Sequence, residues 1–331
     1  MKKLLFLLIV FTAVQCMAQP TYKTVGTVER YDKDLDKIVS EDAKAEIIAE
    51  GFDWSEGALW IEKNKMLLFS DVPTNSIYKW TEAKGKELYL KPSGYTGTIE
   101  RGGEMGSNGL LLDKSGNLVM CQHGNRRMAR MDAQLGSPEP KFIPLATNYR
   151  GKRFSSPNDA TFNSKGELFF TDPPYGLPAQ SDSDPAKELP WNGVYKVKKN
   201  GEVILLVDSL TRPNGIAFFP GEKKLLVANS DPAKPNWYVF DVNGDKLGNG
   251  KVFYHAISEK GMKGLPDGLK IDSEGNVFSA GPGGIHIFNK DGKLLGRLRL
   301  DEATSNCSLS ADQKTLYITN DMYVLRFRMR Q

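Results

Sequence analysis

Short apolar runs recur along the chain, each followed by a turn rich in Gly, Lys, Asp or Asn and then by a second apolar run. The segments with this layout are 58–69, 110–120, 160–170, 216–227, 269–279 and 309–318. Short apolar runs bounded by turn residues predict β-hairpins. Each repeat starts roughly 40–55 residues after the previous one, a spacing typical of propeller blades.

Further strands are expected after most hairpins, at 76–80, 193–197, 237–240, 284–288 and 323–327, with outer strands at 203–207 and 294–298. No long helical period is present. The pattern therefore predicts an all-β fold, a six-bladed β-propeller with four-stranded blades. Closure of the ring needs a strand from each end of the chain, and residues 45–49 are expected to supply the outer strand of the last blade.

The N-terminus has the pattern of an export signal. Lys2 and Lys3 precede an apolar run over 4–14, and small residues around Cys16 and Ala18 predict a signal peptide over 1–18, cleaved before Gln19. The apolar run is too short to span a bilayer, so no transmembrane span is expected. We expect a periplasmic or secreted protein; a lipoprotein anchored through Cys16 is the less favoured alternative. Residues 19–44 are expected to form a surface lead-in, and 45–331 a single catalytic propeller domain.

Composition excludes one class of partner and limits the redox chemistry. The formal net charge is only +4 over 331 residues, without a block of like charges, so no nucleic-acid partner is expected. After signal cleavage only Cys121 and Cys307 remain, both in apolar contexts, and we expect buried free thiols rather than a disulfide framework.

One polar position recurs just before the first strand of every repeat. The residues at this position are Glu56, Asn108, Asn158, Asn214, Asp267 and Asn306. Inner strands of a propeller begin beside the central channel, so these oxygen-bearing side chains are expected to converge. Taken singly, each is readily explained as a turn residue, since Asn and Asp favour turns. Together they predict a site for one divalent cation, with Ca²⁺ favoured and Mg²⁺, Mn²⁺ or Zn²⁺ possible. With only three His in the chain, a zinc site of nitrogen and sulfur ligands is disfavoured.

An ordered set of short motifs spans nearly the whole mature chain. They are Ala49-Glu50-Gly51-Phe52 with Glu56-Gly57-Ala58-Leu59-Trp60, Phe69-Ser70-Asp71-Val72-Pro73, Gly106-Ser107-Asn108-Gly109-Leu110, Cys121-Gln122-His123-Gly124-Asn125-Arg126-Arg127, Ser156-Pro157-Asn158-Asp159, Thr171-Asp172-Pro173-Pro174-Tyr175-Gly176-Leu177, Arg212-Pro213-Asn214-Gly215 and Leu265-Pro266-Asp267-Gly268. The set resembles the gluconolactonase / senescence marker protein (regucalcin-like) family, in particular its exported bacterial members. The paraoxonases and diisopropyl fluorophosphatase are more distantly similar.

The resemblance implies a cation near the channel mouth, held by Glu56, Asn158, Asn214 and Asp267. Asn108 and Asn306 fall at the remaining two positions and are expected to contact substrate. Our hypothesis is hydrolysis of a sugar-derived lactone, in which the cation polarises the ester carbonyl and Asp267 activates water. A direct nucleophilic role for Asp267 is the alternative. Three residues at strand ends, His123, Asp172 and Tyr175, are further candidates for substrate contact, and bracing of a loop is the competing interpretation for each.

Two other functions fit the same pattern. A promiscuous esterase or phosphotriesterase would need an apolar pocket for its substrate, whereas these motifs are polar. A non-catalytic, metal-braced propeller that binds sugar is the second, because fold does not specify function. The expected partner is a small-molecule lactone, and the sequence leaves the oligomeric state, monomer or dimer, open.

Overall fold

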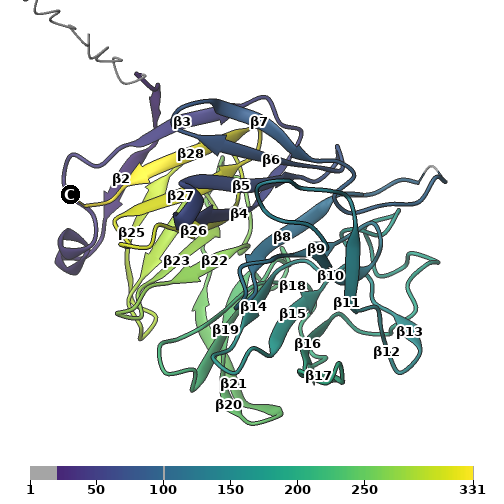
Figure 1. The fold of residues 1–331 in the computed structure, drawn as a ribbon. Helices are drawn as coiled ribbons and strands as arrows, with labels where there is room; N and C mark the ends of the chain where they lie inside the picture. The colour runs from purple at the N-terminus through teal and green to yellow at the C-terminus, as the bar shows by residue number, and fades with distance from the viewer. Residues whose placement is uncertain (1–20, 100, 331) are drawn as a thin grey trace, which may run out of the picture.

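The computed structural model describes residues 21–99 and 101–330. The predicted signal peptide over 1–18, with Cys16, lies outside this range. The described chain forms a six-bladed β-propeller, as predicted, in which each blade contains four antiparallel strands, consecutive in the sequence in blades 1 to 5 (Figure 1). Blades 1 to 3 consist of β4 (Ser55–Ile61), β5 (Met66–Asp71), β6 (Ser76–Thr81) and β7 (Gly85–Leu90); β8 (Ser107–Leu112), β9 (Leu118–Gln122), β10 (Arg127–Met131) and β11 (Phe142–Ala146); and β14 (Ala160–Phe162), β15 (Leu168–Asp172), β16 (Gly193–Val197) and β17 (Val203–Val207).

Blades 4 to 6 follow the same order, except that the outer strand of blade 6 comes from the N-terminal part of the chain. They consist of β18 (Pro213–Phe218), β19 (Lys224–Asn229), β20 (Asn236–Asn243) and β21 (Lys246–His255); β22 (Leu269–Ile271), β23 (Val277–Gly281), β24 (Gly284–Phe288) and β25 (Leu294–Arg299); and β26 (Thr304–Leu309), β27 (Thr315–Asn320), β28 (Tyr323–Arg328) and β3 (Ala45–Glu50). A small hairpin of β12 (Asn148–Tyr149) and β13 (Lys152–Arg153) follows blade 2, and a 3₁₀ turn, η2 (Glu62–Asn64), connects β4 to β5.

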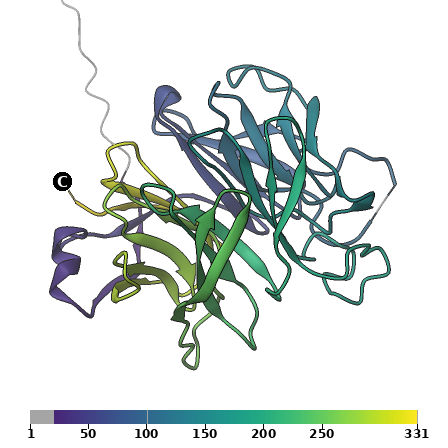
Figure 2. The same cartoon turned by 90° about the horizontal axis from the view of Figure 1, so that it is seen from below.

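The N-terminal segment closes the ring. Strand β3 pairs antiparallel with β28, so the purple N-terminal strand lies beside the yellow C-terminal strand in Figure 1, and the predicted closure is confirmed. The residues before β3, expected to form a surface lead-in, also add strands to two blades. Strand β1 (Thr24–Val25) extends blade 6 and β2 (Thr27–Arg30) extends blade 5. The 3₁₀ helix η1 (Lys33–Lys37) then packs at the edge of the molecule, where it buries Leu35 completely (Figure 2).

The hydrophobic core is divided among the blade interfaces. Six apolar clusters occur, one between each pair of neighbouring blades. The second strand of a blade is therefore covered on both faces, and all residues of β5, β9, β15 and β23 are buried. Such strands read as continuous apolar runs rather than as alternating ones. Cys121 and Cys307 belong to two of these clusters as buried free thiols, as expected.

Among the described residues there is no helix of the length and apolar character that crossing a bilayer requires.

Candidate active site

The inner strand of four blades is irregular at or near the recurring polar position. The pairing register shifts between Glu56 and Leu59 in blade 1, and similar shifts occur near the starts of β8, β18 and β26. Such bulges leave a residue outside the ladder and change the direction of its side chain. In blades 3 and 5 the polar residue precedes the strand instead, at Asn158 and Asp267. Asn108, Asn158, Asn214 and Asp267 thus lie outside the regular pairing of the inner strand, whereas Glu56 pairs with Ser70 and Asn306 with Thr319 next to a register shift.

Hydrogen bonds hold these positions at five of the six junctions between neighbouring blades. The carbonyl oxygens of Asn108, Asn158 and Asn214 accept hydrogen bonds from the preceding blade: from Ser70 Oγ at 2.9 Å, from the Gly109 N–H at 2.8 Å, and from Thr171 Oγ1 at 2.8 Å. On the far side of the ring, the Gly268 N–H donates to the Ser305 carbonyl at 2.7 Å, and Ser305 Oγ donates to the Ser55 carbonyl at 2.6 Å. The backbone is therefore fixed from blade to blade around the channel.

A pocket of about 310 Å³ opens at this ring. Five of the six recurring residues line it: Glu56, Asn108, Asn158, Asn214 and Asp267. They come from five different blades. The remaining wall is formed by Trp54, Glu104, Tyr175, Ser230, Gly264, Leu265 and Thr304. The structure therefore brings together residues separated by more than two hundred positions in the sequence into one polar cavity.

Four of these side chains carry an enclosed oxygen that accepts no hydrogen bond from the described protein atoms. They are the Oδ1 atoms of Asn108, Asn158, Asn214 and Asp267. Burial of a hydrogen-bond acceptor without a partner costs free energy. Four such acceptors at one site therefore indicate that it binds a cation or a molecule with hydrogen-bond donors. Among the described residues no group of three or more His, Cys, Asp and Glu is placed to hold a metal, so a cation would need the amide oxygens as well as the carboxylates. Mixed carboxylate and amide oxygens fit a hard cation such as Ca²⁺.

The carboxylates at the site repel one another. Burial, which removes Glu56 from water, raises its pKa to about 8; the Gly57 N–H, 3.0 Å from Oε2, opposes this, and the charges of Asp159 and Glu104 add to it. The pKa of Asp267 is raised well above its ordinary value, first by loss of solvent and then by the charges of Glu56, Asp159 and Glu104. A bound cation would relieve this repulsion, so the electrostatics also fit a cation site.

Asn306, the sixth recurring residue, does not line the pocket. Its Oδ1 accepts hydrogen bonds from the Cys307 N–H at 2.9 Å and from Lys270 Nζ at 3.4 Å. Burial raises the pKa of Glu56 and of Asp159, and the nearby side-chain amide of Asn306 opposes this rise in both carboxyls. Asn306 therefore connects the acidic groups to Lys270, and direct contact with substrate is not what this geometry favours.

The three strand-end candidates differ in position. Tyr175 lines the pocket and donates from its hydroxyl to the Ser230 carbonyl at 2.8 Å. Asp172 is completely buried outside the pocket, and its two oxygens accept from the N–H groups of Ser155 at 2.9 Å and Ser156 at 2.7 Å. The structure therefore favours loop bracing for Asp172, because both oxygens are already used.

His123 is also fully buried and does not line the pocket, but its ring reaches a residue that does. Its Nδ1 lies 3.2 Å from Oε2 of Glu104. Glu104 was not anticipated from the sequence, since it lies in the irregular segment between β7 and β8, where no periodic pattern marks it. Asp159 was also missed; its signal is that the other residues following the recurring position are Gly or Cys.

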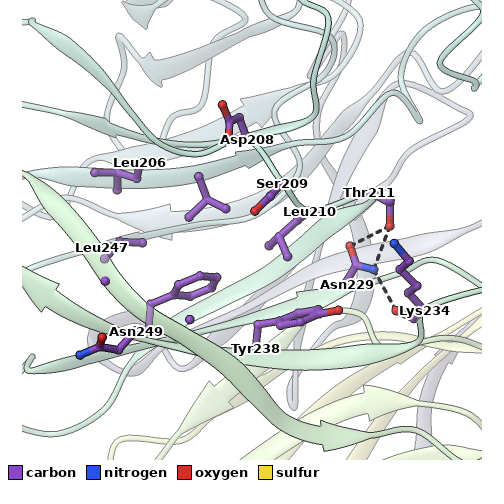
Figure 3. A pocket seen from close by; sticks show the side chains of 14 residues that line it. Leu206, Asp208, Ser209, Leu210, Thr211, Asn229, Lys234, Tyr238, Leu247 and Asn249 are labelled. Carbon is purple, nitrogen blue, oxygen red and sulfur yellow. Dashed lines mark hydrogen bonds between the residues drawn. The ribbon is translucent and has the colours of Figure 1, made fainter.

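A second hollow of about 420 Å³ lies between the outer strands of blades 3 and 4 (Figure 3). Its polar groups are engaged with each other: Asn229 Nδ2 donates to Thr211 Oγ1 at 3.1 Å and to the Lys234 carbonyl at 2.9 Å. In contrast to this hollow, the ring pocket combines converging carboxylates with unpaired acceptors, and it is therefore the candidate active site.

Comparison with known proteins shows the family to which the chain belongs. The profile of the SMP-30/gluconolactonase/LRE-like region matches residues 54–321. The chain is 38% identical over 315 residues to the gluconolactonase of Zymomonas mobilis, covering 93% of this chain and 87% of that protein. It is 22% identical to regucalcin of Xenopus laevis, covering 83% and 85% of the two chains. Among solved structures, a gluconolactonase from Xanthomonas campestris superposes with a TM-score of 0.80 at 27% identity, covering 95% of this chain and 100% of that chain.

Proposed function

Because the chain belongs to the SMP-30/gluconolactonase/LRE-like family and is a gluconolactonase-like lactone hydrolase, we propose that it opens a sugar-derived lactone in a reaction that depends on one divalent cation. The observation that carries this proposal is the set of four enclosed, unpaired side-chain oxygens in one polar pocket. A sugar lactone presents an ester carbonyl and several hydroxyl groups, and the pocket offers the complementary charges and acceptors.

Four residues would hold the cation: Glu56, Asn158, Asn214 and Asp267. Asn108, whose Oδ1 is also unpaired, lines the same pocket. This oxygen is available as a further ligand of the cation or as the acceptor of a hydrogen bond from a substrate hydroxyl. When bound, a dication polarises an ester carbonyl and stabilises the negative charge that develops on its oxygen. Ca²⁺ is the favoured ion because the donors are all hard oxygens and their number is flexible.

The protein's own residues orient the substrate and move the proton. Asp267 has an enclosed oxygen directed into the pocket and acts as the general base that takes a proton from the attacking water. Tyr175 is held in the wall by its hydrogen bond to Ser230, and Trp54 offers an aromatic surface to the substrate ring. Ring opening then breaks the acyl–oxygen bond, and the former ring oxygen accepts a proton to give a hydroxy acid.

The lining also argues for a sugar lactone over the esterase alternative. Three carboxylates and three amides face the pocket, with Trp54 and Leu265 as its large apolar members. An acyl chain in this cavity would leave those polar groups desolvated without partners, which costs binding energy.

We also propose that the protein acts outside the cytoplasm, supported by the basic, then apolar, then small-residue pattern over 1–18. Cell fractionation and the mass of the mature protein test this. A mature chain that begins at Gln19 is expected, and a lipid-modified Cys16 or an uncleaved cytoplasmic protein would contradict it.

Hydrolysis of D-glucono-δ-lactone after chelation, with Ca²⁺, Mg²⁺, Mn²⁺ and Zn²⁺ restored separately, tests the function. We expect turnover only with a restored cation, and a loss of about 100-fold or more in Asp267→Asn at saturating cation. Asp231→Asn, which removes a carboxylate outside the pocket, is the matched control and should retain activity. A folded, metal-loaded protein that hydrolyses neither this nor any other lactone would refute the proposal.

A further inference from the structure

The charge of the candidate active site is unbalanced. Three acidic side chains line it, Glu56, Glu104 and Asp267, and none of the described residues in its lining is Lys, Arg or His. Asp159, buried behind this wall, contributes its charge to both Glu56 and Asp267. A bound dication supplies two positive charges, so the pocket remains acidic toward whatever enters it.

The basic groups near this site are already paired or lie behind it. Lys270 donates to Asn306 and to the Leu269 carbonyl, and it is not among the residues that line the pocket. Arg212, whose charge reaches Tyr175, forms an ion pair with Asp182. Neither residue lines the cavity, so a negatively charged substituent on a substrate would find no cationic side chain among the residues described in the wall.

Glu104 is the acidic residue of the pocket lining that is not a proposed ligand of the cation. Its place in the wall is set by contacts with neighbouring residues. Its Oε2 lies 3.2 Å from Nδ1 of His123, a completely buried ring, while its own side chain is 22% exposed. The segment that carries Glu104 is anchored by Arg101, whose guanidinium donates to the carbonyls of Gly124 at 2.6 Å and of Gly176. Arg101 therefore anchors the chain three residues before Glu104, and His123 is in contact with its carboxylate.

Tight packing around His123 leaves the side chains of His123 and Glu104 little room to move. A Cβ added at Gly176 would lie 2.7 Å from Cβ of His123, so the backbone packs tightly against the histidine. Neither ring nitrogen of His123 forms a hydrogen bond with the described residues, and Nδ1 approaches the carboxylate of Glu104 as a close polar contact. The negative charge of Glu104 also raises the pKa of Glu56, Asp267 and Tyr175, so its field extends across the pocket.

We infer that Glu104, whose carboxylate lies against the buried ring of His123, determines substrate specificity by charge: the site accepts neutral polyhydroxylated lactones and rejects lactones that carry a phosphate or carboxylate. The inference rests on the proposed function. A carboxylate in the wall accepts hydrogen bonds from substrate hydroxyl groups. The same carboxylate repels an anion, and in a poorly solvated cavity that repulsion is stronger than in water.

The test compares a neutral substrate with an anionic one in matched variants. kcat/KM is measured at saturating Ca²⁺ for D-glucono-δ-lactone and for its 6-phosphate, with the wild type, Glu104→Gln and Glu139→Gln. Glu139 is an exposed carboxylate paired with Lys141, so its variant changes the net charge equally without facing the pocket. Calorimetric binding of D-glucose and D-glucose 6-phosphate provides a second readout that does not need catalysis.

We expect Glu104→Gln to raise the anionic-to-neutral ratio by at least about tenfold in both assays, and Glu139→Gln to leave it unchanged. A ratio within one variant does not depend on the fraction of folded protein. Equal ratios in the two variants would overturn the inference. A shifted binding ratio without hydrolysis of either lactone would support the role of Glu104 and refute the proposed function, whereas no binding of either probe and no hydrolysis would overturn both.

Discussion

Gly57 in blade 1 lies against the backbone carbonyl of Asn108 in blade 2, so closely that a Cβ added at Gly57 would lie 2.1 Å from that oxygen. Gly57 also has a positive φ of 57°, a conformation that disfavours other residues. The same residue donates its N–H to Glu56. One glycine thus permits the approach of two blades and the placement of a candidate ligand.

Gly57→Ala should therefore disturb both the fold and the site. We expect the free energy of unfolding to fall by about 3 kcal/mol or more, since the added methyl group must displace backbone. Gly221→Ala is the control, because Gly221 also has a positive φ, 81°, but a Cβ there would meet nothing within 4 Å. It should cost only about 1 kcal/mol in urea unfolding. Equal losses in the two variants would contradict the importance of this contact.

The unpaired oxygens predict which amides bind the cation. Asn158→Ala and Asn214→Ala should each weaken Ca²⁺ binding by at least about tenfold, measured by calorimetry. Each variant removes a side-chain oxygen that has no hydrogen-bond partner and is a proposed ligand of the cation. Asn306→Ala should change the affinity much less, because its Oδ1 is already bonded to Cys307 and Lys270. Its expected effect is on thermal stability. An Asn306 variant that loses Ca²⁺ as strongly as the other two would refute this division.

The raised pKa of Glu56 predicts how stability depends on pH in the cation-free protein. The pKa is about 8 in the folded state against an ordinary value of 4.5, so the folded protein holds a proton that the unfolded chain releases. The stabilising contribution is complete below the unfolded value and is lost as pH rises from there to about 8, by up to a few kcal/mol. Urea unfolding of chelated protein across this range measures it.

Two controls make that result specific. Glu56→Gln should flatten the pH dependence, because the amide does not titrate. Saturating Ca²⁺ should also remove it, since a cation favours the ionised carboxylate. A chelated wild type whose stability rises between pH 5 and pH 8 would contradict the prediction.

Asp172 predicts a variant that separates stability from catalysis. Asp172→Ala leaves the N–H groups of Ser155 and Ser156 buried without acceptors, and we expect a loss of about 2–4 kcal/mol in unfolding free energy. The kcat/KM of the folded fraction should change by less than about threefold, because the side chain does not line the pocket. A large fall in kcat/KM with unchanged stability would assign Asp172 to substrate binding.

The repeated hairpins determined the architecture, because each blade follows the same local rule. A short apolar strand, a turn and a second apolar strand can be recognised within one repeat, without knowledge of distant contacts. The same repetition marked the recurring polar position, and five of its six members line one pocket. Closure by β3 was predictable because a ring of sheets needs its last edge covered.

The repeated pattern could not predict the features in which one blade differs from the others. Asn306 occupies the recurring position, yet Lys270 of the neighbouring blade takes its oxygen, a contact between side chains 36 residues apart. Glu104 and His123 meet across two irregular segments, where no period exists to be read. Local patterns thus determined the fold and the ring of candidate ligands, whereas the partners of each side chain, and the acidic wall that Glu104 completes, were decided only when packing brought distant loops together.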